Sequence, residues 1–142
     1  MVNWKQVVED DLRKYKGLKE AVKCNEAHLE LLSAELAGVK AVDFDAMPKA
    51  DGQANDPTIN ALVMKLELEE RLNLNRRRVA LIEKGLAGLD SEERLALDYF
   101  YIYGYRDAAD KLCEVLNVER STAYNIRNRA RNKYTLACYG IV

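Results

Sequence analysis

The sequence predicts an all-α protein in which a long antiparallel helical hairpin precedes a C-terminal three-helix module with a helix-turn-helix. Apolar residues recur at steps of three and four over two long stretches, and shorter helical patterns separated by turn residues follow them. No stretch shows the alternation typical of a β-strand. In this chain of 142 residues we expect a hairpin domain over 1–88, with a loop at about 39–56, and a second domain over 89–142.

The two hairpin helices are predicted from their apolar seams. The first helix would span about 35 residues, or about 50 Å, along Trp4, Val8, Asp11, Tyr15, Leu18, Val22, Asn25, Leu29, Leu32 and Leu36. Asp56 is a good N-cap and Pro57 a good first residue for the second helix. The seam of that helix runs along Leu68, Leu72, Asn75, Val79, Ile82, Leu86 and Leu89.

The seams match if residues whose numbers sum to about 100 face each other. This register places Asn25 opposite Asn75. A buried Asn pair would satisfy its own hydrogen bonds and oppose slippage, because a shifted Asn would meet Leu. The alternative is that the same seams pair between two chains of a homodimer.

The C-terminal third is divided by capping and turn signals. Asp90 and Glu93 form a predicted capping box. The expected helices are Ser91–Tyr103, stopped by Gly104, then Asp107–Leu116, a turn at 117–119, and Arg120–Leu136. In the aromatic run we expect Tyr99, Phe100 and Tyr103 to pack in the core, and Tyr101 and Tyr105 to be freer to contact the hairpin or a partner.

The last helix carries the residues to which we assign function. Ala123, Ile126, Ala130 and Tyr134 share one narrow arc and should face inward. Asn amides can bond adenine edges and Arg can bond guanine, while Ser, Tyr and further Arg side chains suit phosphates. The DNA-binding residues predicted on this basis are Arg120, Ser121, Tyr124, Asn125, Asn128, Arg129, Arg131 and Asn132. The competing interpretation is a polar helix surface that stays solvated.

The charge distribution favours the same end of the chain. Residues 119–142 contain five basic side chains and one acidic one, whereas residues 85–118 contain three basic and seven acidic ones. The whole chain has a net charge of −1. Positive charge is therefore concentrated where the last helix could meet phosphates. Arg127 lies nearer the buried side and is expected to run along the edge of the core.

Residues 89–134 resemble region 4 of sigma-70-type factors. The resemblance rests on Leu89–Arg94, Tyr99-Phe100, Gly104, Leu116–Val118, Ser121-Thr122 and Arg129–Arg131. With Ser121–Tyr124 and Arg129-Ala130, the whole chain looks like phage transcriptional regulators of the RinA and ArpU type. The resemblance implies sequence-specific promoter binding and activation of late phage genes. In this hypothesis the hairpin would space, dimerise or recruit, with RNA polymerase as the partner it could contact. The segment between Gly104 and the next helix is longer than the sigma pattern, and Cys113 replaces the usual small alanine.

Other functional classes find little support in the sequence. There is no phosphate-binding loop, nucleophile elbow or carboxylate pair, so we expect no enzyme and no cofactor. Cys24 and His28 have a metal-like spacing but no further ligand nearby, so we expect no metal. An odd number of cysteines, no signal peptide and no bilayer-length apolar run predict a cytoplasmic chain with no membrane partner. The alternative function is a phage assembly or polymerase-binding adaptor acting through the hairpin.

Overall fold

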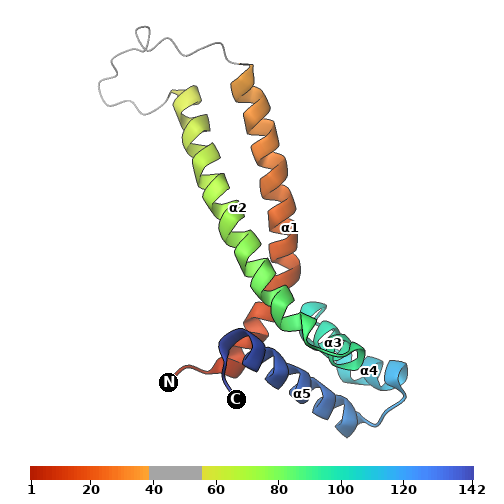
Figure 1. Cartoon of the computed structure of the whole chain (residues 1–142). Coiled ribbons are helices and arrows are strands. Elements are labelled where there is room, and N and C mark those ends of the chain that lie inside the picture. The colour runs from red at the N-terminus through yellow and green to blue at the C-terminus, as the bar shows by residue number, and fades with distance from the viewer. Residues whose placement is uncertain (39–55) are drawn as a thin grey trace. The chain divides into compact units, whose positions relative to one another are not determined.

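The computed structural model describes residues 1–38 and 56–142, and these residues form helices and turns without a strand (Figure 1). The expected all-α fold, with a helical hairpin followed by a helical C-terminal module, is confirmed. The expected loop at about 39–56 lies outside the described residues except for Asp56. The elements are α1 (Trp4–Ala37), α2 (Pro57–Ala87), α3 (Ser91–Leu97), the π-helix η1 (Asp98–Ile102), α4 (Ala108–Leu116) and α5 (Arg120–Tyr139).

The start of α2 is capped as its sequence predicts. Asp56 precedes the helix, and its Oδ1 accepts a hydrogen bond from the backbone N–H of Thr58 at 2.9 Å. Pro57 occupies the first helical position, where its missing N–H costs nothing because that donor would have no intrahelical partner. The predicted N-cap and N1 pair is therefore confirmed.

The chain forms two compact units, the first of which comprises residues 20–76. Here α1 and α2 run antiparallel, and an ion pair joins Arg76 Nη2 to Glu26 Oε1 at 2.7 Å, close to the predicted register. Asn75 is buried, as expected for its seam position. The Asn25 Nδ2 atom is also buried but has no hydrogen-bond partner, so the prediction of a self-satisfied Asn pair is wrong for this atom. Seam spacing determines burial, whereas a hydrogen bond also requires matching side-chain geometry.

The second unit comprises residues 1–19 and 77–142, so the base of each hairpin helix shares a core with the C-terminal helices. One core cluster combines α1, α2, the α3–η1 segment and α5 through Val8, Leu12, Tyr15, Ile82, Leu86, Leu97, Tyr101, Ala130 and Tyr134. A second cluster joins α3, α4 and α5 through Ala96, Leu112, Ala123 and Ile126. The sequence-based domain boundary at residue 88 stays a prediction.

The aromatic run differs from its prediction because the helix changes type. Beyond Leu97 the hydrogen bonds become π-helical, and Tyr103 N donates to Asp98 O at 2.7 Å. A π turn holds more residues than an α turn, so side chains after it are rotated relative to an α-helix. Tyr101 is consequently 5% exposed and Tyr103 51% exposed, so the expectation that Tyr103 packs in the core and Tyr101 is freer is wrong. The expected contact of Tyr101 with the hairpin is confirmed, because its hydroxyl donates to Glu9 Oε1 on α1. Gly104 then ends the helix with φ +67°.

The helix-turn-helix follows the predicted boundaries closely. Asn117 ends α4 in the left-handed conformation with φ 55°, and residues 117–119 connect it to α5. The last helix continues to Tyr139 rather than Leu136 and ends at Gly140, whose φ is 66°. The inward-facing residues predicted for this helix are all buried, namely Ala123, Ile126, Ala130 and Tyr134.

Gly85 permits the close approach of α2 to α5, and its replacement tests this packing. A Cβ there would lie 2.3 Å from Cys138 Sγ and 2.7 Å from the ring of the fully buried Tyr134. We expect Gly85→Ala to lower the free energy of unfolding by about 1–3 kcal/mol through overpacking. Gly17→Ala in α1, with no neighbour within 4 Å, is the matched control and should raise it by about 0.5–1 kcal/mol. Urea denaturation measures both, and equal effects would contradict the packing role.

Candidate nucleic-acid interface

The candidate interface is the side of α5 opposite its buried stripe. The tight turn at 117–119 places this helix directly after α4, and burial of Ala123, Ile126 and Ala130 determines which side faces solvent. Of the predicted DNA-binding residues, the exposed ones are Arg120, Ser121, Asn125, Arg129 and Asn132, whereas Tyr124, Asn128 and Arg131 are half-buried. The predicted set therefore divides into residues open to a ligand and residues committed to contacts within the chain.

Arg129 is open to a ligand and is also committed to a contact within the chain, because it binds the buried Glu93. Its Nε lies 3.2 Å from Oε2 of Glu93, while its side chain remains 52% exposed. Lys133, one helical turn further, places Nζ 2.8 Å from Oε1 of the same carboxylate. Glu93 is completely buried, and the backbone N–H of Asp90 also donates to it at 3.2 Å. One carboxylate thus connects the N-terminus of α3 to two cations of α5.

These donors control the ionisation of Glu93. Burial by itself raises the pKa of this carboxyl, but the hydrogen bonds from Lys133, the Asp90 backbone and Arg129 outweigh it and lower the pKa to about 2. The carboxylate is therefore charged at neutral pH and attracts both cations. The sequence identifies Glu93 as a capping-box residue, but nothing in its spacing indicates the partners on α5, which lie 36 and 40 residues away.

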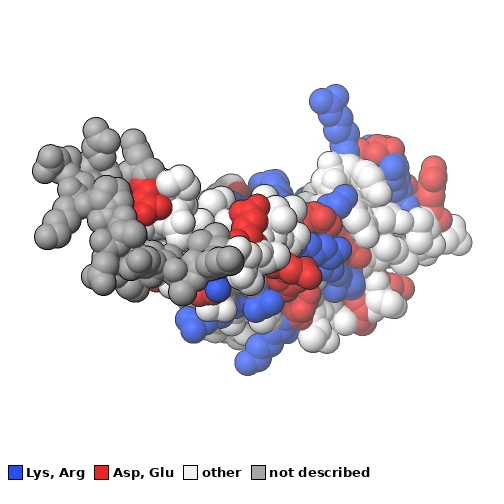
Figure 2. Space-filling view, turned by 90° about the horizontal axis from the view of Figure 1, so that it is seen from above, with Lys and Arg blue, Asp and Glu red and all other residues white. Residues whose placement is uncertain are grey.

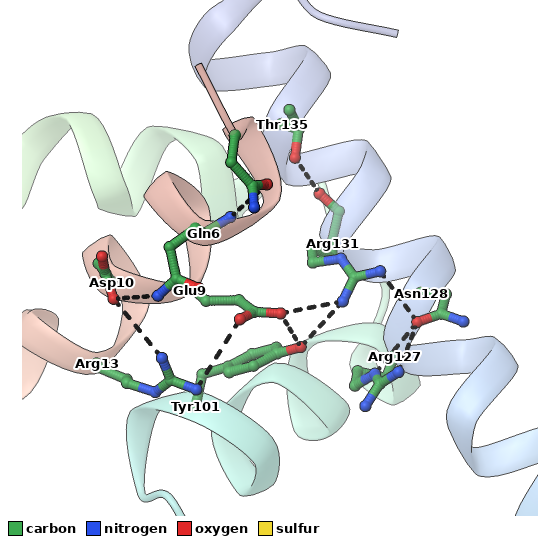
Figure 3. A network of polar contacts seen from close by, with 10 residues as sticks. Gln6, Glu9, Asp10, Arg13, Tyr101, Arg127, Asn128, Arg131 and Thr135 are labelled. Atoms are coloured by element: carbon green, nitrogen blue, oxygen red, sulfur yellow. Dashed lines mark hydrogen bonds and ion pairs between the residues drawn. The ribbon is translucent and has the colours of Figure 1, made fainter. Parts of the chain in front are cut away.

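Arg131 is held in a second network, which ties α5 to the base of α1 (Figure 3). Its Nη1 lies 3.2 Å from Glu9 Oε1 and donates to the Tyr101 hydroxyl at 3.2 Å, and its side chain is 11% exposed. Tyr101 in turn donates to Glu9 Oε1 at 3.2 Å. Burial raises the pKa of the Tyr101 phenol, so the hydroxyl stays protonated as a donor. The predicted role of Arg131 at DNA stays untested, and its visible role is structural.

Asn128 joins Arg127 to this network (Figure 3). Asn128 Oδ1 accepts hydrogen bonds from Arg127 Nη2 at 2.9 Å and from Arg131 Nη2 at 3.2 Å. The Arg127 guanidinium lies 5.0 Å from the ring centroids of both Phe100 and Tyr124. Stacking on two rings explains why Arg127 runs along the edge of the core, as its position on the helix predicts.

The basic excess of residues 119–142 is largely balanced by acids within the unit. Glu93 binds Arg129 and Lys133, and Arg120 Nε lies 3.9 Å from Asp110 Oδ1 on α4. Figure 2 shows acidic and basic side chains interspersed on the face it presents. Because these α5 cations have acidic partners, the exposed side of α5 is only weakly basic, and Ser121, Asn125 and Asn132 provide hydrogen-bonding groups on it.

Comparisons of this chain with protein-family models, curated proteins and solved structures find no match.

Membrane-spanning helices, metal-ligand clusters and cysteines are features of other kinds of site. No helix within residues 1–38 and 56–142 is long and apolar enough to cross a membrane. The same residues contain no group of three potential metal ligands. All three cysteines are free thiols; Cys24 is exposed, and Cys113 and Cys138 are half-buried.

Glu93→Gln tests the buried carboxylate. The variant loses charge-assisted hydrogen bonds to α5, so we expect the free energy of unfolding at pH 7 to fall by about 1–3 kcal/mol. The folded-state pKa of about 2 lies below the ordinary 4.5, so this stabilisation is complete above pH 4.5 and is lost as the pH falls towards 2.

Urea denaturation of both proteins between pH 7 and pH 3 measures this effect. The stability difference between the wild type and Glu93→Gln should be constant at high pH and narrow below pH 4.5. A difference that does not change over this range would contradict the low pKa.

Proposed function

We propose that this chain is a sequence-specific DNA-binding transcriptional regulator, with α5 as its recognition helix. The observation that carries the proposal is the exposed polar side of α5, which follows a tight turn from α4 and lies opposite a fully buried stripe. An α-helix fits the major groove, and a helix-turn-helix presents its second helix there. The resemblance to RinA- and ArpU-type regulators supports activation of late phage or prophage genes as the biological role.

The chemistry of the exposed residues fits base recognition. Asn125 and Asn132 can each bond an adenine edge through both amide atoms. Glu93 binds Nε of Arg129, which leaves the two terminal nitrogens of that guanidinium for a guanine. Arg120 and Ser121, in the first turn of α5, suit phosphates.

The weak net charge of this surface has a consequence for affinity. Few unpaired cations mean few released counterions, so non-specific binding should be weak. One motif reads only a few base pairs, and specific binding then requires a second copy or a partner such as RNA polymerase. We place the protein in the cytoplasm, where three free thiols would stay reduced.

Selection from a randomised duplex pool at two salt concentrations tests the proposal. We expect one enriched motif. On that motif, Asn125→Ala combined with Asn132→Ala should weaken binding by about 1–3 kcal/mol per lost base contact. Both residues are exposed, and neither side chain forms a hydrogen bond with the described part of the chain, unlike Asn128 and Arg131, so the stability of the fold should be unchanged.

The matched control is Asn60→Ala combined with Asn73→Ala, which removes the same side chains from exposed positions of α2. Fluorescence anisotropy with the selected duplex should give wild-type affinity for this control. Equal affinities for all three proteins, or a pool without enrichment, would reject α5 as the recognition helix.

A second candidate function is an adaptor that acts through the hairpin, and one observation favours it. Large apolar side chains are exposed along one side of α2 at helical spacing, namely Ile59, Leu62, Val63 and Leu66. Exposed apolar side chains that adjoin one another often mark a protein contact. RNA polymerase or a phage assembly protein would be the partner.

Leu62→Gln combined with Leu66→Gln distinguishes the two functions. Both side chains are exposed, so the fold and the affinity for the selected duplex should be retained. A transcription reporter under that duplex should lose activation if the hairpin recruits a partner. Unchanged activation would exclude recruitment through this side of α2.

A further inference from the structure

A hollow of about 350 Å³ lies within the second unit, where the base of the hairpin meets the end of α5. It is separate from the exposed side of α5 that carries Ser121 and Asn125. Residues of α1, α2 and α5 all contribute to its lining, which consists of Asp11, Lys14, Leu18, Arg78, Leu81, Ile82, Tyr134, Cys138 and Tyr139. Its volume is within the range of small-molecule sites.

The lining divides into an apolar floor and a charged rim. Ile82 and Tyr134 are buried, and Leu18 packs against the same core cluster. The rim carries two cations from different helices, Lys14 of α1 and Arg78 of α2. A ligand in the hollow would therefore contact apolar side chains on its buried side and the two cations on its exposed side.

Within residues 1–38 and 56–142, no carboxylate forms an ion pair with the cations of the rim. Lys14 and Arg78 differ in this respect from Arg120, Arg129 and Arg131 of the same unit. Among the described residues, the lining contains one acid, Asp11, and its carboxylate already accepts a hydrogen bond from the Tyr139 hydroxyl. The hollow thus presents a net positive rim.

We propose that this hollow binds a small amphipathic anion, with a carboxylate, sulfonate or phosphate group on an apolar or aromatic body. The anionic group pairs with Lys14 and Arg78, and the body covers Leu18, Ile82 and Tyr134. An inorganic anion would leave the apolar floor unfilled, and a neutral apolar molecule would leave the two cations without a partner. The helix α5 lines part of the hollow and also carries the candidate DNA-binding residues. If the proposed function is correct, a ligand bound in the hollow could therefore act as an effector of DNA binding.

The anionic fluorophore 8-anilinonaphthalene-1-sulfonate and its neutral counterpart N-phenyl-1-naphthylamine test the site on the full chain. The two probes share an aromatic body and differ by the sulfonate. We expect the wild type to bind the anionic probe about fivefold more tightly, since two partly exposed charge contacts add modestly to affinity. Lys14→Gln combined with Arg78→Gln should remove this difference and leave the affinity for the neutral probe unchanged.

Lys16→Gln combined with Arg77→Gln is the matched control, because it removes the same charges from the same helices outside the hollow. It should behave as the wild type. Leu81→Glu, at an exposed position in the lining, keeps both cations but adds a carboxylate, and it should weaken the anionic probe. Equal binding of both probes by the wild type, an equal loss in the control, or no binding at all would overturn the proposal. None of these measurements involves DNA, so the result is independent of the function proposed for α5.

Discussion

The arrangement of the C-terminal helices depends on the buried carboxylate of Glu93. Removing a charged group from water costs several kcal/mol, and only well-placed donors offset that cost. Glu93 obtains them from the N-terminus of α3 through Asp90, and from α5 through Arg129 and Lys133. Because all three donors must be in place, this interaction constrains where α5 lies against α3. The exposed side of α5 is oriented as a result.

Several basic residues of α5 are consequently engaged in contacts within the fold. Arg131 is bound to Glu9 and Tyr101, and Arg127 stacks on Phe100 and Tyr124. A surface whose cations are paired in this way attracts polyanions weakly. Any preference of such a surface for one DNA sequence over another would have to come from hydrogen bonds to the bases. Such a surface suits a regulator that relies on base contacts and on a partner more than on bulk charge.

The π-helical segment η1 places Tyr101 in the network of Glu9 and Arg131. Its wider turn carries Tyr101 inward to the core residues of α1, where the hydroxyl meets Glu9 and Arg131. π turns within helices are frequent at functional sites. Here the turn allows the base of α1 and the middle of α5 to share a half-buried polar contact beside the core cluster. The same unit contains the hollow, to whose lining α5 contributes Tyr134, Cys138 and Tyr139.

The sequence by itself determined the all-α fold, the starts of α2, α3 and α5, the capping box at Asp90 and the buried stripe of α5, because each depends on local spacing and local hydrogen bonds. Only the tertiary structure decided the rest. The π turn buried Tyr101 and exposed Tyr103, the opposite of the burial expected for the two side chains, and the Asn25 Nδ2 atom has no hydrogen-bond partner despite the predicted register. The pairings of Glu93 with Arg129 and of Glu9 with Arg131 join residues far apart in sequence. Side-chain contacts at such separations follow from packing, which periodicity does not specify.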